Sequence, residues 1–347
     1  MLEINTHDML FSFFNEQVRL PENKQKEMRS RRDSNRDRLV KGLEKNSDPA
    51  PTGHLIQGSY AMRTMIQREG NDYDIDDGVL FNKDDLKGSK GADKSTAEAR
   101  KMVREALNDE RFNRAPEVLK RCVRVYYDAG YHIDIPVYRE WQDEDSQKNV
   151  RELAASDGWR ESDPKKITDW FNETVTASSP EEKQPYQLRR VVCLLKAWAA
   201  SRNTWNLPSG LIFSVLTDKH YLSVPDRDDT VFIDILERIR FRLELGDKTA
   251  IFPVDGEDFA SGREAKMDNL LDKIDEWLPT LSILSTKDCT TTDAAKAWKK
   301  FFNSPYFDQY ISDEKEEARS TDSAIGLLAT GTVPSSPVTK KGDNTFG

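Results

Sequence analysis

The segment "NDYDIDDGVLF", residues 71–81, places four carboxylates directly in front of an apolar run: Asp72, Asp74, Asp76 and Asp77. In an extended chain alternate side chains share a face, so Asp74 and Asp76 point the same way, with Cα atoms about 6.5 Å apart. Asp72 shares that face, whereas Asp77 points to the other one. Carboxylates this close repel each other unless a cation lies between them, and oxygen ligands favour Mg²⁺ or Mn²⁺. The segment is therefore either a metal-binding strand or a solvated loop.

A calcium-binding loop is the first alternative. With Asp72 at its first position, acidic residues fall at the third and fifth positions as such a loop requires. However, Gly78 occupies the seventh position instead of the sixth, and the twelfth position holds Lys83 instead of Glu. The calcium loop fails at two required positions.

Two other segments favour the metal-binding strand. "YHIDIPVY", residues 131–138, contains Asp134 as the one charge in an apolar strand, and carboxylates from two adjacent strands can hold two metal ions for nucleotidyl transfer. Upstream, "QGSYAMRT", residues 57–64, has Gly58 and Ser59 at a strand-to-helix turn, where backbone N–H groups and a hydroxyl can hold a triphosphate. A Gly-Ser pair alone is weak, but its combination with the acidic strands is specific.

Composition limits the remaining functions. The chain has 347 residues, of which 37% are hydrophobic and 33% charged, and its net charge of -9 argues against a general polyanion-binding surface. Its three cysteines are far apart and no HxxxH pair occurs, so no disulfide frame, zinc site or histidine-based metal site is expected. No signal peptide is visible, and the most apolar stretch, residues 191–200, is too short for a membrane span. These features predict a soluble, cytoplasmic protein without a membrane partner.

Residue patterns predict an α+β fold, with a small mixed sheet followed by a helical half. Expected strands cover residues 54–59, 74–81, 122–127 and 131–138, with a helix at 95–109 between the second and third. Helices are expected at 7–18, 22–46, 162–175, 185–203, 208–222, 228–246 and 264–284.

Thr6 is a plausible N-cap for the first helix. The helix at 22–46 is highly charged and is either a solvated face or a contact surface for phosphates. The predicted division is a core of the mixed sheet with N-terminal helices at 1–165, a helical lobe at 166–315 and a flexible tail at 316–347.

The order of a Gly-Ser turn, an Asp-x-Asp strand, a later strand Asp and a helical half resembles that of polymerase-β-like nucleotidyltransferases. Within this superfamily the sequence resembles the bacterial cGAS/DncV-like nucleotidyltransferases (CD-NTases). The matching text is "QGSYAMRT", "NDYDIDDGVLF", "HIDIPVY", "SDPKKITDWF", "VVCLLKAWA" and "LPSGLIFSVL", and it covers about residues 50–225.

The resemblance implies an active site in the cleft between the nucleotidyltransferase core and the helical lobe. Asp74, Asp76 and Asp134 are implied as catalytic residues that hold two Mg²⁺ (or Mn²⁺) ions. Implied nucleotide-binding residues are Gln57, Gly58, Ser59, Arg63, Lys196 and Ser209. A snorkelling surface lysine remains the alternative for Lys196, and a helix N-cap the alternative for Ser209.

The resemblance also implies a function and partners. Such proteins make cyclic di- or trinucleotides, including cGAMP-like products, from ATP, GTP or other NTPs as signals in anti-phage defence. In some members an E1/E2-like partner conjugates the C-terminal glycine, here Gly347. Activation by double-stranded DNA is disfavoured, because the chain lacks a Cys/His cluster and is acidic. Transfer of a single nucleotide to RNA, a small molecule or a protein remains open, as does an inactive nucleotide-binding interaction protein.

Overall fold

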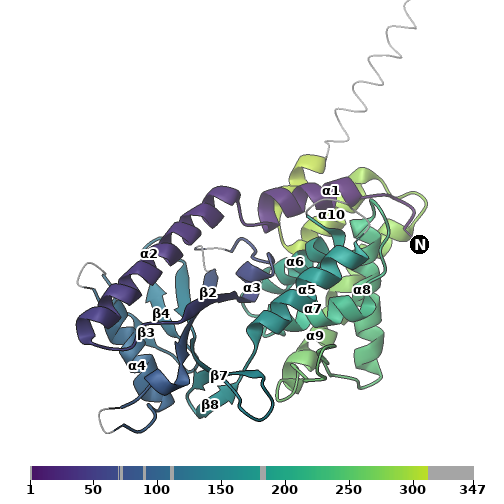
Figure 1. The fold of residues 1–347 in the computed structure, drawn as a ribbon. Helices are drawn as coiled ribbons and strands as arrows, with labels where there is room; N and C mark the ends of the chain where they lie inside the picture. The colour runs from purple at the N-terminus through teal and green to yellow at the C-terminus, as the bar shows by residue number, and fades with distance from the viewer. Residues whose placement is uncertain are drawn as a thin grey trace, which may run out of the picture.

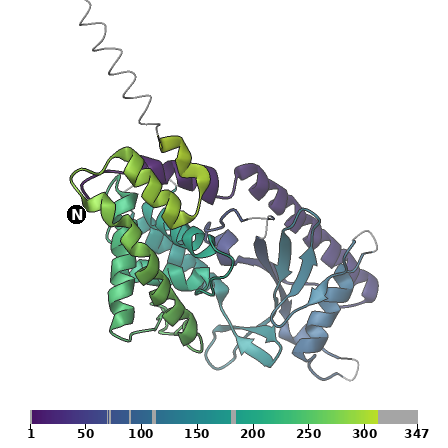
Figure 2. The same ribbon diagram turned by 180° about the vertical axis from the view of Figure 1, so that it is seen from behind.

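The structure is a computed structural model that describes residues 2–68, 70, 73–88, 91–109, 113–179 and 185–311. A mixed sheet with helices packed on it forms one half of the molecule, and a group of helices forms the other (Figures 1 and 2). The α+β class predicted from the sequence is therefore confirmed.

Eight strands of the described residues form one mixed sheet. Their spatial order is β3-β4-β5-β2-β6-β7-β8, and β1 pairs with β2 in addition. The strands are β1 (Gly53–Gln57), β2 (Asp74–Asn82), β3 (Glu117–Val118), β4 (Val123–Tyr126), β5 (His132–Ile135), β6 (Val137–Gln142), β7 (Asn149–Ala155) and β8 (Gly158–Glu161).

Strand β2 is central to this sheet, because it pairs antiparallel with β1 and parallel with both β5 and β6. The two parallel partners follow one another along the chain and are separated only by Pro136. Proline has no backbone N–H to donate to a neighbouring strand, which explains the interruption. The Pro136 carbonyl still accepts a hydrogen bond from Val79 at 2.9 Å. The segment predicted as a single strand at 131–138 is therefore β5 and the start of β6, and both pair with β2.

Helices cover the sheet and build the other half of the molecule. They are α1 (His7–Phe13), α2 (Glu22–Asn46), α3 (Gly58–Ala61), α4 (Thr96–Leu107), α5 (Pro164–Ser178), α6 (Gln187–Ala200), α7 (Gly210–His220), α8 (Asp228–Glu244), α9 (Glu264–Trp277) and α10 (Thr291–Phe302). Four short π- or 3-10-helical segments also occur: η1 (Phe14–Val18), η3 (Lys83–Asp85), η4 (Leu278–Ser285) and η5 (Pro305–Tyr310).

The two halves have separate hydrophobic cores. In the sheet half, β2, β4, β5 and β6 pack against α2 and α4 around buried residues such as Val79, Phe81 and Ile133. In the helical half, α5 to α10 bury aromatic side chains including Trp198, Trp298 and Phe301. Met62 and Ile66, which follow α3, belong to the second core and connect the turn after β1 to the helical half.

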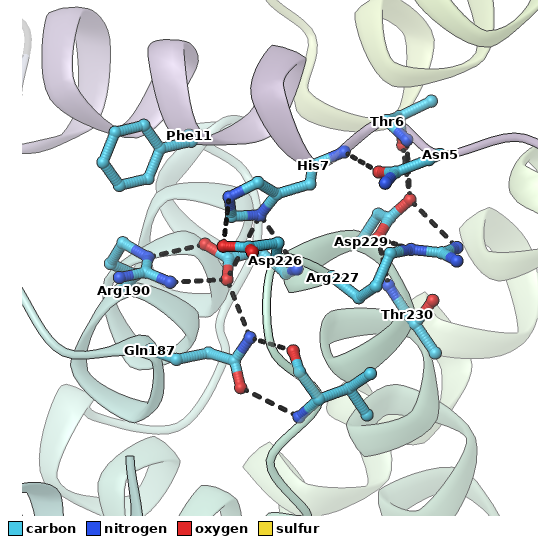
Figure 3. A network of polar contacts seen from close by, with 12 residues as sticks. Asn5, Thr6, His7, Phe11, Gln187, Arg190, Asp226, Arg227, Asp229 and Thr230 are labelled. Carbon is cyan, nitrogen blue, oxygen red and sulfur yellow. Dashed lines mark hydrogen bonds and ion pairs between the residues drawn. The ribbon is translucent and has the colours of Figure 1, made fainter. Parts of the chain in front are cut away.

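Helix α1 packs on the helical half, although it is first in the chain (Figure 1). Thr6 lies at the N-cap position as predicted, but its side chain forms no capping hydrogen bond. Its N–H and Oγ1 instead donate to the buried Asp229 carboxylate at 2.8 and 3.1 Å (Figure 3). Oγ1 also accepts a hydrogen bond from Trp298. The predicted capping role of Thr6 is wrong, because its hydroxyl is used in this tertiary contact.

The neighbouring Asp228 is also fully buried, and two α6 residues satisfy its carboxylate. Arg190 donates to both oxygens at 2.6 and 2.7 Å, and Gln187 donates to one at 3.0 Å (Figure 3). The polar start of α8 therefore ties α6 and the N-terminal segment together.

The helices predicted from apolar spacing are present within a few residues of their expected ends. Described elements that were not predicted include the strands β3, β7 and β8, helix α10 and the short segments η3 and η5. The division at residue 165 stays a prediction, and the tail at 316–347 lies outside the described residues. None of the described helices combines the length and the apolar character that crossing a bilayer requires.

Candidate active site

Asp74, Asp76 and Asp134 lie together because β2 and β5 run parallel in register. Asp76 is directly opposite Asp134, and Asp74 is opposite His132. Ile75 and Ile133 point to the other face, where they are completely buried. The alternation predicted from the sequence therefore places three carboxylates on one face of two adjacent strands.

Asp134 has a fixed ionic partner on the next strand. Arg124, its register partner on β4, donates through Nε and Nη2 to the two Asp134 oxygens at 2.6 and 2.7 Å. This bidentate pair orients the Asp134 carboxylate. It uses about half of the lone pairs that a carboxylate offers, so Asp134 keeps capacity for another ligand.

Asp76 is the carboxylate of the cluster whose ionisation is most disfavoured. Burial raises its pKa well above the ordinary value of an aspartate, and the charges of Asp74 and Asp134 raise this pKa further. Arg124 opposes these effects only in part. A set of three carboxylates that resists joint ionisation fits a hard divalent cation, because such a cation removes the repulsion and accepts oxygen ligands.

His132 is a site residue that the sequence did not predict. One ligand atom each from Asp74, His132 and Asp134 lie within 4.8 Å of one another, a spacing that could hold a metal ion. The expectation of no histidine-based metal site rested on the lack of an HxxxH pair, and it did not consider a histidine that shares a strand face with an aspartate. The available signal was the strand period, since His132 is two residues before Asp134 and shares its face.

Residues 71–81 contain two further carboxylates, Asp77 and Asp72, and neither is placed in the acidic cluster. Asp77 faces the opposite side of β2, where it is buried and accepts hydrogen bonds from Arg36 of α2 through both of its oxygens. It therefore fastens the long helix to the sheet, which places at least this part of the charged helix in a structural role. Asp72 lies outside the described residues.

Gly58 and Ser59 open α3 beside the acidic cluster, as the sequence predicts. Gly58 has φ +65°, and a β-carbon there would lie 2.1 Å from an Asp76 carboxylate oxygen. Only glycine allows both this backbone conformation and this close approach. The turn thus brings the backbone of residues 58–59 against Asp76.

Gln57 and Arg63 lie on either side of this turn. Gln57 accepts a hydrogen bond from the buried Tyr138 hydroxyl at 2.9 Å, so its side chain already has a partner within the sheet. Arg63 is exposed and has a positive φ of 55°. Burial lowers the pKa of nearby Arg189, and the charge of Arg63 lowers it further. The predicted nucleotide contact of each residue remains a prediction.

Lys196 reaches from α6 of the helical half towards the sheet half. Its Nζ donates to the Thr64 carbonyl, and its stem runs past Gly210, where a β-carbon would meet the Lys196 Cε at 2.9 Å. Burial lowers the pKa of Lys196, whereas the Asp74 charge acts in the opposite direction. Lys196 also lines a cleft of about 940 Å³ together with Gln67 and Arg68. This position is unlike that of a snorkelling surface lysine.

Ser209 is the N-cap residue of α7, but its side chain makes no capping hydrogen bond. It is exposed and lines a second cleft, of about 800 Å³, with Arg121 and Lys166. Its chain neighbours Pro208 and Gly210 line the cleft that Lys196 lines. Its phosphate contact stays a prediction, and Gly347 lies outside the described residues.

Comparison with known proteins agrees with this architecture. Residues 53–138 match a family model described as the nucleotidyltransferase domain of cyclic GMP-AMP synthase DncV-like proteins. The sequence is 29% identical over 186 residues to a cyclic GMP-AMP synthase of Escherichia albertii, covering 51% of this chain and 39% of that protein. The aligned part of the chain thus spans about two fifths of that relative's length.

Two solved structures show the same fold. The Vibrio cholerae di-nucleotide cyclase DncV has a TM-score of 0.70 at 16% identity, with 87% of this chain and 96% of that chain covered. The Bradyrhizobium diazoefficiens CD-NTase CdnG, solved with GTP, has a TM-score of 0.65 at 14% identity, with 88% and 97% covered.

A parallel strand pair with clustered carboxylates lies next to a Gly-Ser turn and a helical half, and the two solved structures share this fold. In residues 53–138 the sequence matches the nucleotidyltransferase domain of DncV-like proteins. The resemblance that the motifs indicated is thereby confirmed.

Proposed function

We propose that this chain is a cyclic oligonucleotide synthase that joins ATP and GTP into a cyclic GMP-AMP-like product. The observation that supports this most strongly is the register that sets Asp76 opposite Asp134, with the Gly58 turn packed on the Asp76 carboxylate. The match of residues 53–138 to the DncV-like nucleotidyltransferase domain and the names of the matched relatives support the cyclic product.

Each group has a role in the proposed reaction. Asp74, Asp76 and Asp134 would hold two Mg²⁺ or Mn²⁺ ions, which when bound neutralise charge on the transferring phosphate and the leaving pyrophosphate. Ser59 and the backbone N–H groups of the turn would hold the donor triphosphate. Asp134, held in one orientation by Arg124, would accept the proton of the attacking ribose hydroxyl.

Lys196 would add a cation on the helical side of the donor. Its half-buried ammonium has only one described hydrogen-bond partner residue, Thr64, so donors remain for a phosphate oxygen. After the first transfer, the linear dinucleotide would turn over in the same cleft and close into a ring. A role of this product in anti-phage signalling is part of the proposal.

Incubation of the purified chain with all four NTPs and Mg²⁺ or Mn²⁺, followed by phosphatase treatment and mass spectrometry, tests the proposal. A cyclic synthase yields phosphatase-resistant oligonucleotides from NTPs alone. A single-nucleotide transferase yields no such product and releases pyrophosphate only when an acceptor is added. An inactive binding protein yields neither.

A further inference from the structure

The acidic cluster contains a nitrogen ligand. His132 of β5 lies opposite Asp74 of β2, and one ligand atom from each lies within 4.8 Å of a carboxylate oxygen of Asp134. Asp76 is not a member of this group, so the group is a position of its own beside the Asp74–Asp76 pair.

The His132 ring is largely buried, and within the described part of the chain it has no hydrogen-bond partner. The residue is 8% exposed, and its Nε2 lies 3.9 Å from the nearest Asp74 oxygen, too far for a hydrogen bond. Among the described residues, its other aromatic or charged neighbour is the Tyr126 ring at 6.4 Å between centroids. The His132 ring nitrogens are not fully buried, so they reach solvent beside the two carboxylates and have unused ligand capacity.

We propose that Asp74, His132 and Asp134 form a cation position that prefers a first-row transition-metal ion such as Mn²⁺ over Mg²⁺. Imidazole nitrogen is a good ligand for transition-metal ions, whereas Mg²⁺ prefers oxygen and gives up its water reluctantly. The inference deepens the proposed function, because it assigns one of the two cation positions a mixed nitrogen and oxygen ligand set.

Arg124 does not prevent binding at this position. It occupies one lone pair on each Asp134 oxygen, and the remaining lone pairs stay available. Its positive charge does weaken the site, so we expect affinity for Mn²⁺ in the micromolar to millimolar range instead of tight resident binding. The site should therefore be titratable with free metal in the absence of nucleotide.

The chain offers a matched control in His54 of β1. Its Nδ1 also lies 3.9 Å from an aspartate oxygen of β2, in this case Asp77. Among the described residues, no second carboxylate joins His54 and Asp77 in a group that could hold a metal ion. The two histidines thus differ in their ability to bind metal but not in distance from a β2 carboxylate.

The test is a titration of the metal-free full chain with Mn²⁺, without nucleotide, in which free Mn²⁺ is measured by electron paramagnetic resonance. We expect His132→Asn to weaken Mn²⁺ binding at least tenfold and His54→Asn to leave it unchanged. In competition experiments with Mg²⁺, the His132 variant should lose less affinity for Mg²⁺ than for Mn²⁺. His132→Gln, which keeps a longer side chain, serves as the second variant if the first does not fold.

Three results would overturn the inference. The wild-type chain could bind no Mn²⁺, or the wild type and the His132 variants could bind Mn²⁺ with equal affinity. The third is that substitution of His132 weakens Mn²⁺ and Mg²⁺ binding by the same factor. Equal losses would mean that His132 only positions Asp74. Because the assay needs no nucleotide, a chain that binds Mn²⁺ through His132 but forms no cyclic product would refute the synthase and leave this inference intact.

Discussion

Asp76 and Asp77 are consecutive residues of β2, yet their carboxylates have opposite electrostatic surroundings. Asp77 is buried against Arg36, whose guanidinium donates to both of its oxygens. Asp76 faces Asp74 and Asp134, which raise its pKa in addition to the effect of burial. One charge stabilises the fold, and the other is costly until a cation arrives.

The first prediction compares isosteric substitutions at these two positions in the metal-free protein. Asp76→Asn should raise Tm by about 3 °C, because the amide removes the repulsion. Asp77→Asn should lower the free energy of unfolding by about 2 kcal/mol, because Arg36 loses a charged partner. Thermal unfolding followed by circular dichroism checks both signs. A lower Tm for Asp76→Asn would show that the cluster is not under electrostatic strain.

The second prediction is the pH dependence of the increase in Tm caused by Asp76→Asn. For an acid whose folded-state pKa is raised, the native state binds the proton more tightly than the unfolded chain. The wild type therefore loses stability as pH rises from the unfolded pKa to the raised folded pKa of Asp76. The Tm advantage of Asp76→Asn should be greatest at neutral pH and disappear below about pH 4. An advantage that is constant with pH would contradict this origin.

The third prediction concerns the Gly58 turn. In Gly58→Ala the new β-carbon would lie 2.1 Å from Asp76, so Asp76 must move and nucleotidyl transfer should fall at least 100-fold. Gly246→Ala is the control for backbone strain alone. Gly246 also has a positive φ, but a β-carbon there would meet no atom within 4 Å, so nucleotidyl transfer should be unchanged. Both variants should lose about 1 kcal/mol of stability from backbone strain. Similar product rates in the two variants would argue against the Gly58–Asp76 contact as a part of the site.

The fourth prediction concerns Lys196. Lys196→Met keeps the length of the stem but removes the ammonium that donates to Thr64. The KM for the donor nucleotide should rise about tenfold, a loss of roughly 1.4 kcal/mol of binding, while the folded state is retained. Lys219→Met, at an exposed lysine of α7 that lies 4.0 Å from Asp247, should leave KM unchanged. An unchanged KM in the Lys196 variant would assign that lysine a purely structural role.

Much of the fold and of the acidic site could be predicted because it depends on short-range periodicity. Alternation in β2 and β5 separates Asp74 and Asp76 from Ile75, and Asp134 from Ile133, without knowledge of the tertiary structure. The helical half follows in the same way from apolar residues at three-to-four spacing.

The rest depends on pairing between distant segments. No local pattern indicates that Arg36 would bind Asp77, that Asp229 would take the Thr6 hydroxyl away from its capping role, or that Lys196 would reach Thr64. His132 was detectable in principle, but a search for helical HxxxH spacing overlooks a ligand that shares a strand face with an aspartate. Strand β7 pairs with β6 and β8 along a segment of mixed polarity that gives no alternating signal.

The most direct test of the central claim is the product made from ATP and GTP by the wild type, by Asp74→Asn/Asp76→Asn and by Asp84→Asn/Asp85→Asn. The last pair neutralises two exposed acids just beyond β2 and so matches the charge change. Mass spectrometry after phosphatase treatment should find a cyclic dinucleotide with the wild type and the Asp84/Asp85 variant, and none with the Asp74/Asp76 variant. An undiminished cyclic product from the Asp74/Asp76 variant, or none from the wild type with either Mg²⁺ or Mn²⁺, would contradict the account.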